Sequence, residues 1–224
     1  MVAKISIVIP TLDAADSLPA CLEALFEGLT AGLIRELIVS DGGSQDATCA
    51  IADEAGAHVL TGPASRGGQL RRGCAGAKGE WLLVLHADTV LDRAWSQVVG
   101  DHIEVSGQGA YFRLGFRAGG FAPAWVAGWA NLRSRLFGLP YGDQGLLVRR
   151  AVYERVGGYP DQPLMEDVAL VRALPRLSGL PVRATTSASR YRAGWLRRGA
   201  RNLWTLTRYF AGADPQKLAA RYRR

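Results

Sequence analysis

Two aspartates in the first half of this 224-residue chain stand directly after short apolar runs. Asp41 follows the run 37–39, and Asp88 follows the run 81–85 with His86 in between. A single acid in such a place is commonly a turn former or a helix N-cap. Two acids at the ends of neighbouring strands would instead form a site for a hydroxyl-rich or metal-bound ligand, because open α/β sheets bind ligands beyond the carboxyl ends of their strands.

The two strand-end acids suit different ligand groups. Asp41 precedes two glycines that let a backbone approach a ligand closely, so its carboxylate can accept hydrogen bonds from a base or a ribose. Asp88 is a hard oxygen ligand for Mg²⁺ or Mn²⁺ that bridges a diphosphate. The residues Pro10, Thr11 and Asp13 follow the first apolar run, and we expect them at the same edge of the sheet.

Basic and amide side chains that could hold a phosphate follow in the next segment. Arg66 precedes a Gly-Gly pair in an expected loop, and Gln69, Arg71 and Arg72 stand one turn further on. Their N–H groups suit phosphate oxygens. Arg71 and Arg72 have an alternative interpretation as a solvated helix face, so Arg66 and Gln69 are the favoured contacts.

The elements that must position these side chains alternate between strand and helix in the first half. We expect strands at 5–9, 37–39, 58–60 and 81–85, separated by helices. The first helix begins near Ser17, and its apolar residues recur at three- and four-residue spacing, which is typical of a helix packed on a sheet. This order predicts an α/β fold with a mixed, mainly parallel sheet and helices on both faces.

The second half of the chain is less regular. We expect strands at 109–116 and 145–148 and helices at 124–137 and 165–177. Two helical tryptophans at four-residue spacing, Trp125 and Trp129, could stack on a sugar ring but are more typical of core.

Two further groups of acids fall in this half. Asp143 and Gln144 lie in a glycine-flanked loop that could shape a sugar or acceptor pocket. Glu166 and Asp167 fall in the first turn of the helix expected at 165–177. The helix dipole favours carboxylates in that place, so this pair could serve the helix alone.

Cysteine usage and hydropathy exclude several classes of protein. The three cysteines (Cys21, Cys49 and Cys74) are far apart and fall in expected helices, which indicates reduced packing residues in a cytoplasmic protein. No histidine is grouped with them at the spacing of a zinc site. No apolar run approaches the roughly 18 residues that would span a bilayer.

The formal net charge of +7 is unevenly distributed. Residues 187–224 contain nine arginines and one lysine against a single acid, Asp214, so the rest of the chain is nearly neutral. This asymmetry indicates a localised anionic partner rather than a nucleic-acid-binding surface.

Within the basic tail, the segment from Trp195 to Phe210 has a helical pattern. Arg197, Arg201 and Arg208 recur near one face, while apolar residues that include Leu203 lie on another. Such a helix can lie in a membrane interface, where it would contact an anionic surface peripherally and bring the site to a lipid-borne acceptor. The alternative is that the apolar face closes the core and the arginines are solvated.

Four motifs in order resemble the family 2 glycosyltransferases of GT-A (Rossmann-like) fold. They are Ile-Val-Ile-Pro-Thr, Leu-Ile-Val-Ser-Asp-Gly-Gly-Ser-Gln-Asp, Leu-Leu-Val-Leu-His-Ala-Asp-Thr and Met-Glu-Asp. The third is similar to a subgroup of small bacterial members. The resemblance covers essentially the whole chain and implies a single domain, residues 1–224. Its nucleotide-sugar half would be 1–95, its acceptor and catalytic half 96–186, and its basic helical tail 187–224.

The resemblance also implies roles for individual residues. Thr11 and Asp41 fall where such enzymes hold the base and ribose, and Asp88 matches the last acid of the Asp-x-Asp metal motif. His86 replaces the first acid of that motif; a neutral imidazole can ligate a metal. Because hard Mg²⁺ prefers oxygen, a weakly held Mn²⁺ or Mg²⁺ is expected.

The expected reaction is transfer of a sugar from a nucleoside diphosphate, most simply a UDP sugar, to an acceptor hydroxyl with inversion. Such a transfer needs a general base. The resemblance gives this role to the pair Glu166 and Asp167, of which we favour Asp167, with Asp143 in reserve.

Two other functions remain open. A nucleotidyltransferase of similar fold would carry a Gly-rich basic loop after the first strand, where this chain has Pro-Thr-Leu-Asp-Ala-Ala. A non-catalytic protein that binds phosphate or nucleic acid would gain nothing from acids at Asp88 and Asp167.

Overall fold

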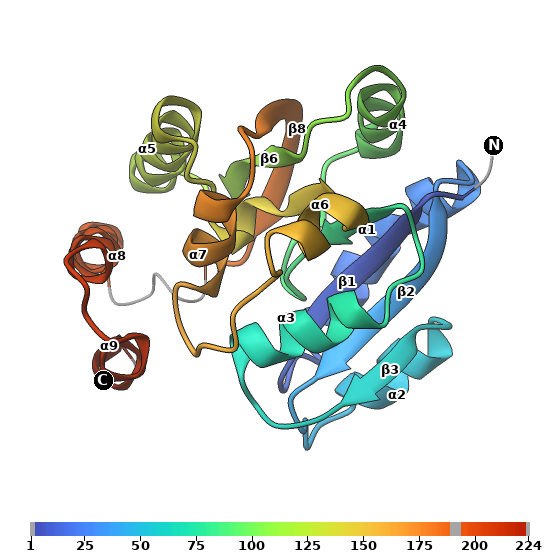
Figure 1. Cartoon of the computed structure of the whole chain (residues 1–224), viewed down its shortest axis with the longest axis horizontal. Helices are drawn as coiled ribbons and strands as arrows, with labels where there is room; N and C mark the ends of the chain where they lie inside the picture. Colours follow the sequence, from blue (N-terminus) through green and yellow to red (C-terminus); the bar gives the residue numbers. More distant parts are fainter. Residues whose placement is uncertain (1–2, 189–193, 223–224) are drawn as a thin grey trace.

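The structure is a computed structural model that describes residues 3–188 and 194–222, and its centre is one eight-stranded sheet (Figure 1). The strands are β1 (Ile5–Thr11), β2 (Ile34–Asp41), β3 (His58–Thr61), β4 (Trp81–Val84), β5 (Val90–Leu91), β6 (Ala110–Phe116), β7 (Leu146–Arg149) and β8 (Ser178–Thr186). The helices are α1 (Leu18–Thr30), α2 (Thr48–Glu54), α3 (Arg66–Ala75), α4 (Trp95–Val105), α5 (Phe121–Phe137), α6 (Arg150–Arg155), α7 (Glu166–Ala173), α8 (Trp195–Phe210) and α9 (Pro215–Tyr222), with a 3₁₀ turn at Gly142–Gln144.

The sheet is mixed and mainly parallel, as the sequence predicts, with the order β3-β2-β1-β4-β7-β6-β8-β5. β1 pairs in parallel with β2 and β4, and β2 pairs in parallel with β3. Their carboxyl ends therefore meet at one edge, where Thr11 lies directly opposite Asp41. β7 runs antiparallel to β4 and β6, which brings the turn with Asp143 toward the same edge.

Helices cover both faces of the sheet, which confirms the predicted layers. On one face Ile7 and Ile9 pack in a core that includes Trp95 of α4. On the other face Val8 packs in a core that includes Leu70 of α3. Strands buried on both faces need nearly continuous apolar sequence, and β4 is buried at all four positions.

Two expected boundaries are wrong, and one strand was not expected. α3 begins at Arg66, which is therefore not a loop residue, because the Oγ of Ser65 accepts a hydrogen bond from the N–H of Gly68 and caps the helix. The helix expected at 165–177 ends at Ala173, two residues before Pro175, which cannot continue a helix. The remainder of that segment leads into β8, a strand that the apolar pattern does not predict.

The cysteines lie in α1, α2 and α3, as expected, and are free. Burial raises the pKa of both Cys21 and Cys74 to about 12, so these two thiols are unreactive packing groups. Among residues 3–188 and 194–222, no helix combines the length and the apolar character that crossing a bilayer requires.

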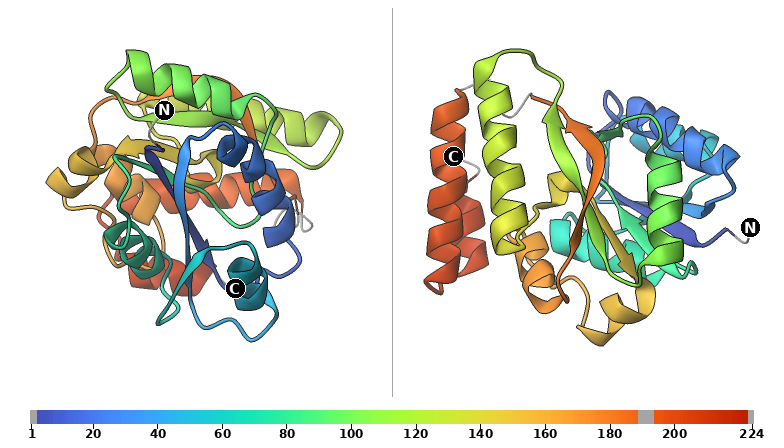
Figure 2. Two further views of the ribbon diagram at one scale, coloured as in Figure 1. Left: turned by 90° about the vertical axis from the view of Figure 1, so that its right-hand side faces the viewer. Right: turned by 90° about the horizontal axis from the view of Figure 1, so that it is seen from above.

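Two long helices, α5 and α8, pack against each other. α5 packs on β6, and α8 lies beside α5 on the outside of the molecule (Figure 2). The interpretation of Trp125 and Trp129 as core residues is wrong, since their exposed fractions are 52% and 48%. The buried side of α5 is formed instead by smaller residues, including Val126, Ala130 and Ser134.

Candidate active site

Two adjoining cavities open at the carboxyl ends of the central strands. The carboxylate cavity contains Asp88, Asp143, Glu166 and Asp167 and is also lined by Arg66, His86, Phe116, Tyr141, Thr186, Ser187, Arg198 and Asn202. The larger strand-end cavity is lined by residues that include Pro10, Thr11, Asp13, Gln69 and Arg117. Arg66, His86 and Asp88 line both cavities, so the two spaces meet at these three side chains.

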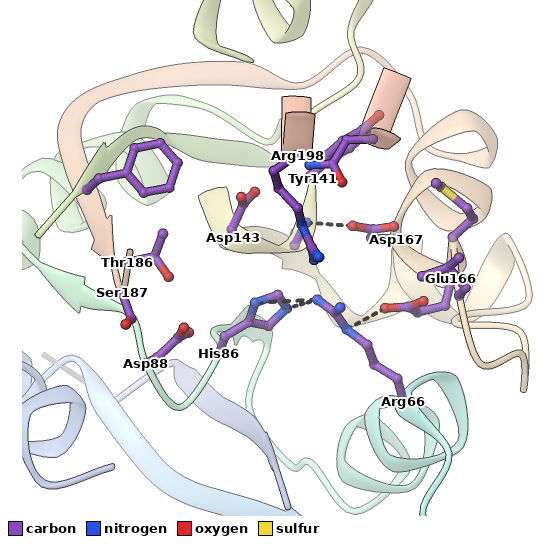
Figure 3. Close-up of a pocket in the computed structure, with 15 residues that line it drawn as sticks. Arg66, His86, Asp88, Tyr141, Asp143, Glu166, Asp167, Thr186, Ser187 and Arg198 are labelled. Carbon is purple, nitrogen blue, oxygen red and sulfur yellow. Dashed lines mark hydrogen bonds and ion pairs between the residues drawn. The ribbon is translucent and has the colours of Figure 1, made fainter. Parts of the chain in front are cut away.

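Arg66 lies between a histidine and a carboxylate (Figure 3). Its Nη2 is 2.7 Å from Nε2 of His86, and its Nε is 2.7 Å from Oε1 of Glu166. The same Nη2 is 3.4 Å from Nδ1 of His86, so the guanidinium lies close to both nitrogens of the imidazole. His86, which the sequence predicts as a metal ligand, is therefore in contact with Arg66 in this arrangement.

Glycine at position 142 allows the loop of Asp143 to approach these groups. A Cβ atom at Gly142 would lie 2.6 Å from Nε2 of His86, so a larger residue would collide with the imidazole. The N–H of Gly142 donates to Oδ2 of Asp167 at 2.7 Å, and the N–H of Val168 donates to Oδ1 of Asp167 at 2.8 Å. Asp167 is thereby oriented at the N-terminus of α7, at the wall of the cavity.

The residue before this helix holds an uncommon backbone conformation. Met165 has φ 62°, in the left-handed region that costs a side chain of its size energy. The two residues that follow Met165, Glu166 and Asp167, both line the carboxylate cavity. The acid pair thus stands both in the first turn of α7 and at the wall of the cavity.

Asp143 is a half-buried carboxylate of the cavity. Burial raises its pKa above the ordinary value of 3.8; Arg133 opposes this shift, and the negative charge of Asp167 adds to it. Its Oδ1 accepts no hydrogen bond from the residues that the structure describes. A carboxyl oxygen with these properties, at a cavity wall, is suited to exchange a proton or to accept a ligand.

Asp88 lies where the two cavities meet. Within residues 3–188 and 194–222 no group donates to its carboxylate, and the nearby Arg117 donates to its backbone oxygen instead. No three His, Cys, Asp or Glu side chains of this described part are close enough together to hold a metal ion. The residues therefore fit a divalent cation only if a diphosphate supplies further oxygen ligands, with Asp88 as the protein carboxylate.

The predicted direct contact of Asp41 with a nucleoside is corrected by the structure. Asp41 is buried and is not among the cavity residues; its carboxylate accepts hydrogen bonds from Thr11, from the N–H of Gly43 and twice from Ser44. Burial alone would raise the pKa of Asp41, but these hydrogen bonds hold it below the ordinary value. Asp41 therefore supports the loop that shapes the cavity, whereas Thr11 lines it.

Two amide side chains are also reassigned. Gln69 is buried and donates from Nε2 to the backbone oxygens of Thr11 and Ser40, so it fastens two strand ends while one side reaches the strand-end cavity. Gln144 is fully buried, lines neither cavity, and bonds to Phe112 and Ser134. The predicted substrate contact of Gln144 is wrong, because its amide bonds to Phe112 of β6 and Ser134 of α5 instead.

Several cavity residues escaped the sequence analysis. Thr186 and Ser187 lie at the end of β8, and Arg198 and Asn202 come from the inner face of α8. Motifs after the first strands point to none of them, since only tertiary packing brings the tail to the site. The charge of the tail was the one available signal. Arg71 and Arg72, by contrast, line neither cavity.

Comparison with known proteins finds a family model and a curated relative. The family model described as Glycosyl transferase family 2 matches residues 6–139. A TPR repeat-containing protein of Synechococcus elongatus is 40% identical over 99 residues, which is 43% of this chain and 23% of that protein. The chain thus matches less than a quarter of the length of this curated relative.

Solved structures share the fold. Glucosyl-3-phosphoglycerate synthase of Mycobacterium tuberculosis, in complex with Mn²⁺, UDP and phosphoglyceric acid, is 21% identical with a TM-score of 0.55, over 83% of this chain and 69% of that one. S. aureus TarS is 16% identical with a TM-score of 0.63, over 91% of this chain and 38% of that one. At these identities the similarity concerns the fold alone.

Proposed function

The chain belongs to glycosyl transferase family 2, and from this premise we propose that it transfers a sugar from a nucleoside diphosphate to an acceptor hydroxyl. The observation that carries the proposal is the cavity in which Asp88, Asp143 and Asp167 face one another beside Arg66. A site that only bound anions would not gather three acids, because they repel a phosphate. A transferase needs a positive group that binds the diphosphate and a negative group that takes the proton of the acceptor hydroxyl.

The strand-end cavity suits the nucleoside and the carboxylate cavity suits the sugar. Thr11 and Asp13, beside Pro10, offer polar side chains at the strand-end cavity, and the UDP bound by the mycobacterial relative makes uracil the first base to test. Arg66 lines both spaces and would meet the diphosphate that connects nucleoside and sugar.

A divalent cation fits this donor through Asp88. The relatives crystallised with Mn²⁺ or Mg²⁺ together with UDP support Mn²⁺ or Mg²⁺ here. When bound, the cation would neutralise diphosphate charge as the leaving group departs. His86 would then position Arg66, since its Nε2 already lies 2.7 Å from Nη2 of that side chain.

Asp167 is proposed as the general base. It would take the proton of the acceptor hydroxyl as that oxygen attacks the anomeric carbon from the face opposite the diphosphate. The bond between the anomeric carbon and the diphosphate oxygen breaks, and its electrons leave with the nucleoside diphosphate. The glycoside formed has the inverted configuration, and the proton remains on the carboxylate. Asp143, on the same cavity, is the alternative base.

The acceptor is proposed to be carried by a lipid, with α8 in peripheral contact with the cytoplasmic face of an anionic membrane. In α8 the polar residues Arg198 and Asn202 face the cavity, whereas Trp204 on the outside is 64% exposed. Leu206 of the same helix packs inward against Met165 and Val168, so part of the apolar face does contribute to the core. A helix with tryptophan and arginine on its outer side suits a bilayer interface.

Thermal unfolding with a panel of nucleoside diphosphates tests the donor. A ligand that binds the native state raises its stability, so we expect UDP to raise Tm more in Mn²⁺ than in EDTA. If no nucleoside diphosphate raises Tm while nucleoside triphosphates or nucleic acid do, a nucleotidyltransferase or a binding protein replaces the transferase. Transfer from a radiolabelled UDP sugar to a lipid extract, compared with water-soluble acceptors, then tests the acceptor class.

A further inference from the structure

The outer side of α5 is apolar along its whole length. Phe121, Trp125, Trp129, Leu132 and Leu136 recur every three or four residues, so they form one stripe on the helix, which we call the α5 ridge. Phe121 is 84% exposed and Leu136 is 64% exposed, and the other three are also exposed. The opposite side of α5 is already buried, so the ridge is not needed for the core.

The neighbouring helix repeats this arrangement. α8 packs beside α5 (Figure 2). It also leaves Leu203, Trp204 and Phe210 exposed. Soluble proteins seldom leave large apolar side chains together on the surface unless the surface has a partner. Two adjacent helices with three exposed tryptophans between them therefore indicate a docking surface.

The charge around these helices identifies the kind of partner. The sequence has no acidic residue between Glu104 and Asp143 or between Asp167 and Asp214. The charged residues of α5 and α8 are therefore all arginines. Exposed arginines flank the apolar residues on both helices, Arg135 on α5 and Arg197 on α8. Arginine without acid, together with exposed tryptophan, suits the headgroup region of an anionic bilayer.

A second copy of the chain fits this surface less well. In a two-fold dimer the same patch meets itself, so arginines would face arginines. Because neither helix offers an acid, no ion pair could compensate the repulsion.

We propose that the α5 ridge inserts into the interfacial region of an anionic lipid bilayer, with α8 beside it. α5 spans about 25 Å at 1.5 Å per residue, enough for a helix to lie in the plane of the interface. The 3₁₀ turn of Asp143 follows α5 closely, and Arg198 of α8 lines the carboxylate cavity, so the docked helices hold that cavity near the lipid. The inference rests on the proposed function for its purpose, delivery of a lipid-borne acceptor, and extends the membrane contact from α8 to α5.

Co-sedimentation of the full chain with vesicles tests this surface. We expect binding to vesicles of phosphatidylglycerol and phosphatidylcholine at low salt, and weaker binding to pure phosphatidylcholine or at high salt. The double variant Trp125→Ser/Trp129→Ser should bind about ten- to hundred-fold more weakly, because two large side chains no longer enter the interface. The matched control is Phe26→Ser/Leu29→Ser, which removes two exposed apolar residues of α1, away from α5 and α8, and should bind as the parent does.

Quenching of tryptophan fluorescence by brominated lipid gives a second readout. In a Trp195→Phe/Trp204→Phe variant, quenching should come from Trp125 and Trp129, since the two tryptophans that remain in the core are fully buried. Quenching of this variant, lost when Trp125 and Trp129 are also replaced, supports insertion of the ridge.

The inference is overturned if the ridge variant binds vesicles as the parent does, or if brominated lipid quenches no tryptophan fluorescence. It is also overturned if sedimentation velocity shows that the parent is a dimer and the ridge variant a monomer, and neither protein binds vesicles. The rise of Tm with UDP, measured on the same variants, separates this result from the proposed function. A ridge variant that loses vesicle binding but keeps its UDP response is folded and retains the donor site. Vesicle binding without any rise of Tm with UDP would contradict the proposed transferase activity but still support the membrane-binding surface on α5 and α8.

Discussion

The Nε of Arg66 lies 2.7 Å from Oε1 of Glu166, and this ion pair joins the first residue of α3 to the first residue of α7 across the carboxylate cavity. Glu166 is almost fully buried, and its charge is compatible with that burial because Arg66 is adjacent. The same guanidinium also reaches His86, so one side chain connects three elements of the site.

Replacement of Arg66 by alanine should therefore weaken both folding and donor binding. We expect a loss of about 2–4 kcal/mol in the free energy of unfolding, toward the lower value because the Arg66 side chain is 32% exposed. Urea unfolding measures this loss, and Glu166→Gln in the same chain should restore part of it. Arg71→Ala is the control, since Arg71 lies on the same helix but lines neither cavity; equal loss in both variants would contradict the role of the ion pair.

Asp88 should control how strongly the binding of UDP depends on a divalent metal. In the Asp88→Asn variant, UDP should raise Tm equally in Mn²⁺ and in EDTA, because the protein carboxylate that shares the cation has been removed. In the parent protein the rise should be larger with Mn²⁺. The His86→Ala variant tests the other predicted metal ligand. If this variant loses the difference in Tm between Mn²⁺ and EDTA while Asp88→Asn keeps it, the histidine holds the cation.

Arg198 should contact the diphosphate from the tail. Arg198→Ala is expected to weaken UDP binding by about ten- to hundred-fold, the loss of one charge-assisted hydrogen bond, and to leave uridine binding unchanged. Isothermal titration with UDP and with uridine measures both. The adjacent Arg197 is exposed and lines neither cavity, so Arg197→Ala should bind UDP as the parent does; a similar loss in both variants would point to net charge alone.

The identity of the base can be decided between two aspartates. Asp167→Asn should lower kcat by about 10²–10⁴ and leave UDP affinity within a few-fold, because general-base catalysis contributes that range. Asp143→Asn should keep most of the turnover. If the two results are exchanged, Asp143 is the base and Asp167 orients the loop through the N–H of Gly142.

The parts of the fold that follow from local pattern were predictable. Apolar runs gave the central strands, and residues directly after them, such as Thr11 and Asp88, reach the cavities as expected. Hydrogen-bond partners could not be predicted in this way. Asp41 and Gln144 have the residue types of ligand contacts, yet hydrogen bonds within the protein occupy their polar groups, from Thr11, Gly43 and Ser44 to Asp41 and between Gln144 and Phe112 and Ser134.

The second half was less predictable because tertiary packing overrides its local signals. Trp125 and Trp129 have the spacing of a core pair, but smaller residues of α5 face the sheet and the tryptophans face outward. Arg198 enters the site only because α8 packs its polar side inward. No rule of periodicity distinguishes these orientations.

The raised pKa of Asp143 makes a prediction for stability against pH. The folded protein holds the Asp143 proton more tightly than the unfolded chain, so the native state binds more protons in the window above the ordinary pKa of 3.8. The contribution of Asp143 to stability is therefore fully present below pH 3.8 and is lost as pH rises through the higher folded pKa. The amide of an Asp143→Asn variant stays neutral at every pH and escapes that loss. We expect the variant and the parent to have similar Tm near pH 3.5 and the variant to be more stable at pH 7–8, as measured by calorimetry without metal or nucleotide. A variant that is less stable than the parent at pH 7–8 would show that the charged carboxylate is satisfied in the fold and that burial does not dominate its titration.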